Sequence, residues 1–358
     1  LLTADEYKEA RASTLNAFYT SPTVIKAMYE ALGNMGLSKG NVLEPSCGVG
    51  NFMGLVPDSM EKIRMYGVEL DSISGRIAQQ LYQKNKIAVQ GFETMQFPDS
   101  FFDCAVGNVP FGSFGVHDTR YDREHWLIHD YFFGKTIDKV RTGGIIAFIT
   151  SSGTLDKASG NVRRYIAQRC ELIAAVRLPS DTFRQSAGTE VTSDILFLQK
   201  RERMADRDEP WLHVGKTGDG VPINQYFAEH PEMVLGDMVM ESGPFGPRSV
   251  CRPRPGQDLG AALHAALEGL DARLPAALPL EQAEQEIEVL PADPDVRNYS
   301  FTEVDGRLYF RENSVMRAVE LDGANTRRVR ELIALRGQTR RLMQVQLDGC
   351  GDAAVQLE

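Results

Sequence analysis

The residues Asn108-Val109-Pro110-Phe111 place a side-chain amide, a proline and an aromatic ring directly after the apolar run 101–107. Such a run predicts a buried strand, and ligands of open α/β sheets bind outside the carboxyl ends of the strands. An amide oxygen and a backbone carbonyl both accept hydrogen bonds from an exocyclic amino group, which frees its delocalised lone pair. Pro110 stiffens the turn, and Phe111 offers a face for stacking a base taken out of its helix. These residue types favour methyl transfer to an amino nitrogen.

The same four residues also fit a plainer interpretation, a strand-ending turn with a phenylalanine in the core. Asn and Pro gather in turns for backbone reasons alone. The residues upstream of this stretch therefore distinguish between the two interpretations.

A strand-to-helix turn with two glycines one residue apart lies upstream, at residues 44–50, and ends in Gly48-Val49-Gly50. Glycines there let the backbone approach a ligand closely. A dinucleotide-binding fingerprint needs a third glycine at position 53, where this chain has Met53, so the pattern disfavours NAD. Glu69 ends the next predicted strand, and its carboxylate suits the two hydroxyls of a ribose, although a surface acid at a strand end is the alternative. Residues 91–93 offer an aromatic face and an acid to an adenine ring.

Four signals in this order resemble the N6-adenine DNA methyltransferases. Residues 43–52 are similar to their S-adenosylmethionine motif, Asp/Glu-Pro-x-x-Gly-x-Gly-x-Phe, and residues 108–111 to their catalytic motif, Asn-Pro-Pro-Tyr/Phe. Residues 18–22 resemble the segment that covers the methionine end of the cofactor, and residues 187–198 resemble a late motif of type I modification subunits. The resemblance covers roughly residues 15–200, and the order of the motifs is that of the gamma class.

This resemblance implies a Rossmann-like α/β fold with a mostly parallel seven-stranded sheet, S-adenosyl-L-methionine as cofactor, no metal, and DNA as substrate with the target adenine flipped out. The implied catalytic residues are Asn108, Val109, Pro110 and Phe111. The implied cofactor contacts are Tyr19, Thr20, Glu44, Pro45, Ser46, Cys47, Gly48, Gly50, Phe52, Glu69, Leu70, Phe92, Glu93 and Asn108. One departure from the family motif is Val109 in place of its first proline, which leaves the backbone carbonyl available.

Alternating strand and helix patterns support this fold class. The predicted strands are residues 42–43, 65–70, 87–89, 104–108, 144–150, 172–178 and 195–198. The predicted helices between or before them are residues 23–32, 71–84, 125–140 and 162–170. We therefore expect an N-terminal helical segment over the cofactor site at residues 1–40 and a catalytic domain at residues 41–200.

Residues 201–358 form an expected C-terminal extension. Residues 211–255 are rich in Gly and Pro, which predicts loops with short helices, and residues 257–274 and 325–346 have helical patterns. Residues 299–310 suggest a hairpin around Asp305-Gly306. Residues 223–227 and 299–316 resemble the connection between a methyltransferase and a helicase in large proteins of phages and conjugative elements. The chain begins with Leu rather than Met, so we expect it to be continuous with further domains.

The composition of the 358 residues, 42% hydrophobic and 25% charged, is that of a globular protein. No run of apolar residues is long enough to span a membrane. Five widely spaced cysteines, without a zinc spacing, fit a reduced, cytoplasmic setting. The formal net charge of −10 argues against strong non-specific binding to nucleic acid by the chain as a whole.

Several alternatives stay open. A protein-glutamine methyltransferase uses the same kind of catalytic motif, because an amide nitrogen poses the same chemical problem. A non-catalytic module that binds cofactor or DNA in a larger machine fits Val109 and the acidic balance. Residues 117–125 hold His, Asp and Arg side chains that suggest either a metal or nuclease site or, as we prefer, a mobile loop. No region for reading a DNA sequence is evident; residues 201–290 offer the only room.

Arginines of the predicted helix 162–170 are a further candidate contact. They could touch DNA phosphates, although a solvated helix face is the simpler interpretation. These side chains are Arg163, Arg164 and Arg169.

Overall fold

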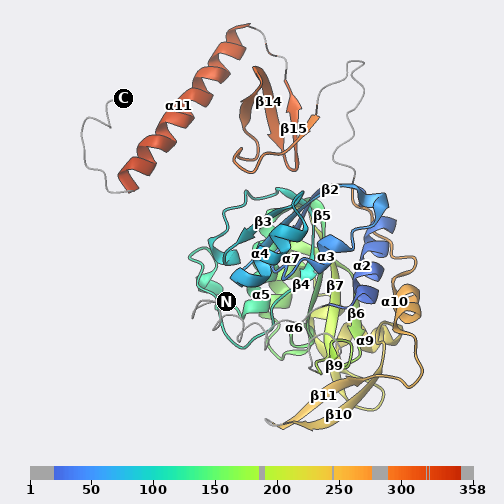
Figure 1. The fold of residues 1–358 in the computed structure, drawn as a ribbon. Coiled ribbons are helices and arrows are strands. Elements are labelled where there is room, and N and C mark those ends of the chain that lie inside the picture. The colour runs from blue at the N-terminus through green and yellow to red at the C-terminus, as the bar shows by residue number, and fades with distance from the viewer. Residues whose placement is uncertain are drawn as a thin grey trace. The chain divides into compact units, whose positions relative to one another are not determined.

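The computed structural model describes residues 20–184, 190–243, 246–275, 289–319, 321 and 323–347. Contacts divide the chain into two units, Leu1–Ala276 and Ala277–Glu358 (Figure 1). The boundary between units thus lies downstream of residue 200, where the sequence pattern changes. The division into functional regions at residues 40 and 200 stays a proposal.

A seven-stranded sheet forms the centre of the first unit, in the order β3-β2-β1-β4-β5-β7-β6 (Figure 1). Its strands are β1 (Lys39–Glu44), β2 (Lys62–Glu69), β3 (Lys86–Val89), β4 (Phe102–Asn108), β5 (Val140–Ser151), β6 (Cys170–Leu178) and β7 (Ser193–Lys200). All neighbouring pairs from β3 to β5 are parallel, whereas β7 runs antiparallel to β5 and β6. Strands β4 and β5 are buried almost throughout, because a parallel strand inside such a sheet is covered on both faces.

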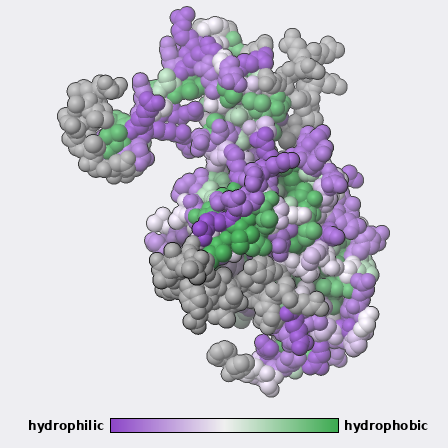
Figure 2. All heavy atoms as spheres, viewed as in Figure 1, coloured by the Kyte–Doolittle hydropathy of each residue, from purple (hydrophilic) through white to green (hydrophobic). Residues whose placement is uncertain are grey.

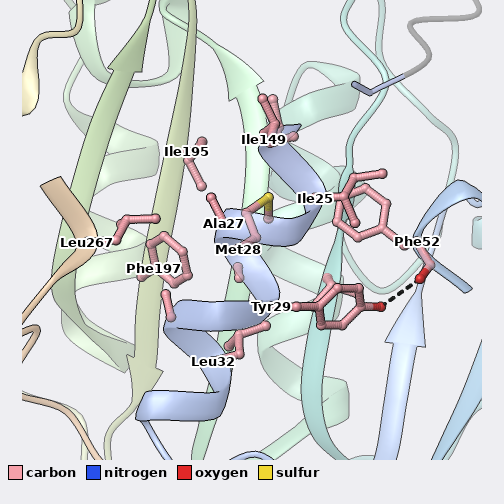
Figure 3. Close-up of a cluster of buried hydrophobic side chains, with 14 of the residues drawn as sticks. Ile25, Ala27, Met28, Tyr29, Leu32, Phe52, Ile149, Ile195, Phe197 and Leu267 are labelled. Atoms are coloured by element: carbon pink, nitrogen blue, oxygen red, sulfur yellow. Dashed lines mark hydrogen bonds between the residues drawn. The ribbon is translucent and has the colours of Figure 1, made fainter. Parts of the chain in front are cut away.

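Helices cover both faces of this sheet. The longer ones are α2 (Pro22–Asn34), α4 (Ser72–Leu81), α5 (Ile128–Lys139), α7 (Asn161–Arg169) and α10 (Leu259–Leu267), with short helices α3 (Asn51–Gly54), α6 (Gly153–Asp156) and α9 (Gln225–Glu229). On one face, the apolar side of α2 packs with Ile149, Ile195, Phe197 and Leu267 (Figure 3). On the other face, the ring of Phe148 meets Phe133 of α5, because successive strand residues point to opposite faces.

The expected Rossmann-like methyltransferase fold is confirmed. Each predicted strand and helix of residues 20–200 is present, with ends that differ by a few residues. Ser21 caps α2 by accepting a hydrogen bond from the backbone of Val24, and Asp71 caps α4 through Ser74. These caps explain why both helices begin where the sequence changes from extended to helical pattern.

Residues 201–275 belong to the same unit. They form β8 (Val214–Lys216) paired with β9 (Pro222–Asn224), and a longer hairpin of β10 (Asp237–Gly243) and β11 (Gly246–Arg252). The prediction of loops and short helices for residues 211–255 was wrong for residues 237–243 and 246–252, which form strands. Seven paired positions hold that hairpin together, whereas its sequence lacks the alternating apolar face by which strands are recognised. The predicted helix 257–274 is shorter in the structure and ends at Leu267.

The second unit contains a four-stranded antiparallel sheet in the order β12-β15-β14-β13. Its strands are β12 (Val289–Pro291), β13 (Phe301–Val304), β14 (Arg307–Glu312) and β15 (Val315–Ala318). The predicted hairpin around Asp305-Gly306 is confirmed, and so is the helix near residues 325–346, which is α11 (Gly323–Leu347). In the part of the chain that the structure describes, no helix combines the length and apolarity needed to cross a membrane.

Candidate active site

The turn after β1 and the residues after β4 lie side by side, because these two strands pair directly at Leu43 and Ala105. The Ser46 hydroxyl donates a hydrogen bond of 2.9 Å to the carbonyl oxygen of Asn108. The structure therefore brings together the two predicted motifs, which are 62 residues apart in the sequence.

The two glycines of the turn have different roles. Both have positive φ, +54° at Gly48 and +87° at Gly50. A Cβ atom added at Gly48 would meet no atom within 4 Å, whereas one at Gly50 would lie 2.4 Å from the ring of Tyr82. Gly50 is thus required for packing, and the open space is in front of Gly48.

Glu69, at the end of β2, is joined to this turn. Its two carboxylate oxygens accept hydrogen bonds from the backbone N–H of Gly48 at 2.7 Å and of Asp71 at 2.8 Å. Burial raises the pKa of Glu69, although these two donors act in the opposite direction. A carboxylate oxygen accepts more than one bond, so Glu69 retains the capacity to bind hydroxyl groups beside Gly48.

Glu44 is the most unusual group at the site. Its side chain is 2% exposed, and its buried Oε2 accepts no hydrogen bond from any residue that the structure describes. Burial, followed by the negative charge of Glu69, raises the pKa of Glu44 well above its ordinary value. A buried acid without a donor is costly, so a ligand that brought a donor or a positive charge would stabilise this position.

The remaining cofactor candidates fall into two groups. Pro45, Cys47 and Phe52 are buried, and the carbonyl of Phe52 accepts a 2.9 Å hydrogen bond from Tyr29 of α2 (Figure 3). Leu70, next to Glu69, is 75% exposed. Ile77 and Leu81 of the following helix, α4, are exposed as well, and Figure 2 shows hydrophobic residues on the surface over that helix. Leu70 is thus open to a ligand, whereas the three buried residues shape the turn.

Residues 91–93, which follow β3, are less open to a ligand than the sequence suggested. Phe92 is buried against Phe132 of α5, with 5.1 Å between ring centroids, and the ammonium of Lys135 lies 5.1 Å from its ring centroid. Lys135 also donates to the carbonyl of Glu93. Thr20 is buried, and Tyr19 lies outside the described residues. The cofactor roles of these residues stay predictions.

The residues after β4 are held from two sides. The Val109 N–H donates a 3.0 Å hydrogen bond to the carbonyl of Ile149, and the Val109 side chain is 1% exposed. Phe111 is half-buried and packs against the core cluster.

Phe114, which was not predicted from the sequence, is 58% exposed, and its ring lies over Gly112. Phe114 could have been recognised as a candidate from the sequence, because it is an aromatic residue in a polar loop only three positions after Phe111.

The loop 112–127 is tied to α5. Asp118 accepts hydrogen bonds from Tyr131 at 2.8 Å and from Lys135 at 3.0 Å. Burial opposes its ionisation, but these two donors outweigh burial and hold the pKa of Asp118 below its usual value. Within the described residues, no group of three or more His, Cys, Asp or Glu side chains is placed to share a metal ion. Whether the loop moves stays a prediction.

One prediction about basic residues needs correction. Arg163 is buried and donates to the carbonyls of Leu212 and Lys157, so it is neither a phosphate contact nor part of a solvated face. A positive charge at this depth is satisfied by backbone carbonyls, which the helical pattern does not reveal.

The late motif contributes a buried ion pair. Asp194 of β7 accepts two hydrogen bonds from Arg177 of β6, at 2.8 and 2.9 Å, and Arg177 also donates to Asp156. Asp156 in turn accepts from the backbone N–H of Asn224. Residues 223–227 are thereby attached to α6, which follows β5.

A family model and two relatives match this chain. The family model described as N-6 DNA Methylase matches residues 3–217. The chain is 30% identical over 207 residues to "Defense against restriction protein B" of Escherichia phage P1, which covers 56% of this chain and 9% of that protein. It is 34% identical over 94 residues to the type II methyltransferase M.CvrRI of Paramecium bursaria Chlorella virus XZ-6E, covering 26% and 24%. This chain therefore spans less than a quarter of the length of either relative.

Among solved structures, the chain is similar to the type I restriction enzyme EcoKI M protein. The TM-score is 0.45 at 14% sequence identity, and the match covers 70% of this chain and 69% of that one.

Proposed function

The chain belongs to the N-6 DNA methylase family, and on that premise we propose that it transfers a methyl group from S-adenosyl-L-methionine to the N6 amino group of adenine in DNA. The observation that carries the proposal is the hydrogen bond from Ser46 to Asn108, which joins the predicted cofactor turn to the predicted target-binding residues. Because only part of each relative is matched, the activity of the whole protein is part of this proposal.

The residues around Gly48 fit the cofactor. Open space in front of Gly48, the acceptor capacity of Glu69 and the unsatisfied Oε2 of Glu44 suit a ligand with ribose hydroxyls and positive charge. Glu69 would hold the ribose of the cofactor, and Leu70 would contact its adenine. Thr20 and Tyr19 would lie near its methionine portion. When bound, the cofactor supplies an electrophilic methyl group on its sulfonium.

The target amino group would be held by Asn108 and the carbonyl of Val109. Ser46 fixes the backbone carbonyl of Asn108, and Ile149 fixes the N–H of Val109. The peptide between the two acceptors is therefore positioned before substrate arrives, which reduces the cost of alignment. Phe111 would stack on the base, and the exposed ring of Phe114 is a second candidate for that contact.

Substitution of Val109 for the first proline of the family motif is compatible with this role. The group that acts is the backbone carbonyl, which every residue has. A proline has no N–H and so lacks the bond that Val109 makes to Ile149. In this chain a hydrogen bond and a buried side chain replace the stiffness of a proline ring.

The cysteines of the described residues are poorly suited to act as a catalytic nucleophile. Cys47, Cys104, Cys170 and Cys251 are free and buried, and burial raises the pKa of Cys170 and Cys251 to about 12. A buried thiol with a raised pKa supplies little thiolate at neutral pH. Attack by an amino nitrogen needs no enzyme nucleophile.

The setting of the reaction is also part of the proposal. Free cysteines suit the cytoplasm. The resemblance of residues 223–227 and 299–316 to a connecting region suggests that the chain works as part of a larger protein that contains a helicase.

The test is a methyl-transfer assay with radiolabelled cofactor on three substrates: duplex DNA, DNA in which adenine is replaced by N6-methyladenine, and a glutamine-containing peptide. Transfer to the first substrate only is expected. Transfer to the peptide would favour the protein-glutamine alternative. Cofactor binding in calorimetry without transfer to any substrate would favour the non-catalytic module.

A further inference from the structure

A cavity of about 680 Å³ lies at the same edge of the sheet as the candidate active site. One wall is the end of β5 and the start of α6, at residues 151–153, and β5 is the neighbour of β4. The opposite wall is the hairpin β10–β11, which contributes Met240 and Arg248 among others. A cavity of this size is in the range of ligand sites rather than of packing defects.

A chain of hydrogen bonds connects the hairpin to the candidate catalytic residues. Val109 bonds to Ile149 of β5, and the next residues of β5 lead to Ser152, whose N–H donates to the carbonyl of Thr192 at 3.1 Å. The Thr192 hydroxyl accepts a 3.0 Å bond from the N–H of Cys251 in β11. These bonds attach the base of the hairpin to the same strand, β5, that positions Val109.

The hairpin projects from the body of the unit as a two-stranded antiparallel ribbon (Figure 1). Each strand has seven residues, and such a ribbon is one of the two kinds of element that fit the major groove of B-DNA. Met240 is 47% exposed on it, and an exposed apolar side chain of this kind suits the methyl group of thymine.

Basic and acidic residues line the cavity in equal number. Its lining contains four basic residues, Lys157, Arg184, Arg248 and Arg252, and four acidic ones, Asp156, Asp181, Glu190 and Glu241. A surface that grips the phosphate backbone carries an excess of cations. A surface that reads base edges needs both kinds of group, because Arg pairs with guanine while carboxylates accept from cytosine.

Arg248 is the cation best placed for such a contact. Arg252 is paired with Glu241 at 2.9 Å, and Arg184 with Glu190 at 3.4 Å. In the described part of the chain Arg248 has no ion-pair partner, and its side chain is exposed. Its guanidinium is therefore available without the loss of an existing pair.

We propose that the hairpin β10–β11, with the cavity beside it, reads the bases next to the target adenine, and that Arg248 is a specificity-determining residue. The proposal rests on the proposed function in one respect, that the substrate is DNA. It assigns a role to residues 237–243 and 246–252, in a chain whose sequence showed no region for reading DNA.

The experiment is a binding selection with the full chain, on a pool of duplexes in which the positions around one adenine are randomised. Bound duplexes are recovered and sequenced at fixed salt. The wild-type chain is expected to enrich particular bases. Arg248→Ala is expected to lower the preference at one or two positions by roughly 5- to 150-fold, because one bidentate base contact is worth about 1–3 kcal/mol. The preference at the other positions stays.

Arg254→Ala is the matched control. Arg254 follows the same hairpin and pairs with Asp237 at 2.9 Å, but it does not line the cavity, so the base preference should not change. Thermal unfolding establishes that both variants are folded. A wild-type chain without preference, equal effects of the two substitutions, or a uniform loss of affinity over all sequences would each overturn the proposal.

Methyl transfer is measured separately on the same duplexes. Base preference without transfer would remove the proposed function and leave the reading role intact. Methyl transfer without base preference would leave the proposed function intact and remove the reading role of the hairpin.

Discussion

The Ser46 hydroxyl lies 2.9 Å from the carbonyl oxygen of Asn108 and donates a hydrogen bond to it. This bond spans the carboxyl ends of two neighbouring parallel strands, where the sheet brings segments together that are distant in the sequence. It orients the Asn108 peptide from the cofactor side, while the bond from Val109 to Ile149 orients it from the side of β5. The relationship supplies a direct test of whether the two loops act as one site.

Ser46→Ala removes this bond and leaves the acidic residues of the turn in place. We expect roughly a 10- to 100-fold decrease in kcat, because small displacements of a positioned acceptor are costly in catalysis. Cofactor affinity should change little. Ser46→Thr keeps the hydroxyl and should retain most of the activity. Steady-state kinetics and calorimetry on both variants check this, and equal losses in the two variants would contradict it.

Asn108→Ala removes the side-chain acceptor for the target amino group. We expect kcat to fall by at least about 100-fold, the usual loss when one preorganised group that stabilises developing charge is removed. Cofactor affinity should stay within about twofold of wild type in calorimetry, since Glu69 and Gly48 are unchanged. A variant that still turns over at the wild-type rate would exclude Asn108 from the reaction.

Glu44→Gln tests the buried acid. Because burial raises the pKa of Glu44 in the folded chain, the unfolded chain releases its proton first as pH rises. Stability is therefore fully present below the ordinary pKa of a glutamate and is lost as pH rises toward the folded value. The pKa of Glu69 is raised as well. Glu44→Gln should therefore remove only part of the dependence of stability on pH.

Melting temperatures of the cofactor-free chain between pH 5 and 8 provide the measurement for Glu44→Gln. The variant should be more stable than wild type at the alkaline end, by about 1–3 kcal/mol for the relief of an unsatisfied buried group. It should also bind cofactor more weakly. A variant that is less stable at every pH would show that Glu44 has a stabilising partner.

Asp194→Asn tests the buried pair of the late motif. Arg177 would keep Asp156 but lose the negative charge of Asp194 and one of its two hydrogen bonds to that side chain, because asparagine keeps a single acceptor oxygen. Removal of one partner from a buried pair typically costs about 3–5 kcal/mol, so we expect a decrease near the lower end of that range in denaturant unfolding. The exposed pair provides the control: Asp237→Asn removes the partner of Arg254 and should cost less than about 1 kcal/mol.

Much of the sheet was predictable because long apolar runs are typical of strands buried on both faces. Residues 104–108 and 144–150 are such runs, and the placement of Asn108 at a strand end followed from them. The hairpin β10–β11 was missed because its stability comes from pairing between strands rather than from a periodic apolar face. Strands β12 and β15 are short and pair across 23 or more residues, which no local pattern reveals.

At the candidate site, the residue types could be predicted from the sequence, but the separate role of each residue could not. The spacing of Gly48 and Gly50 suggested two equivalent glycines, whereas only the surroundings show that Gly50 faces Tyr82 and Gly48 faces open space. Phe92 was expected to face a ligand, but its ring packs on α5. Side-chain burial of this kind depends on tertiary contacts between distant elements, and a single sequence does not specify them.

Val109→Pro restores the family motif and tests whether this chain has replaced the proline by other means. The variant loses the N–H that donates to Ile149, so we expect it to be destabilised by about 1 kcal/mol without any gain in kcat. Val109→Ala keeps that bond and removes only part of a buried side chain, so it separates packing from hydrogen bonding. Unfolding curves and kcat of the two variants provide the measurement. A faster Val109→Pro enzyme of unchanged stability would mean that the bond to Ile149 contributes nothing, and that the valine is a loss of function rather than an alternative way of fixing the same carbonyl.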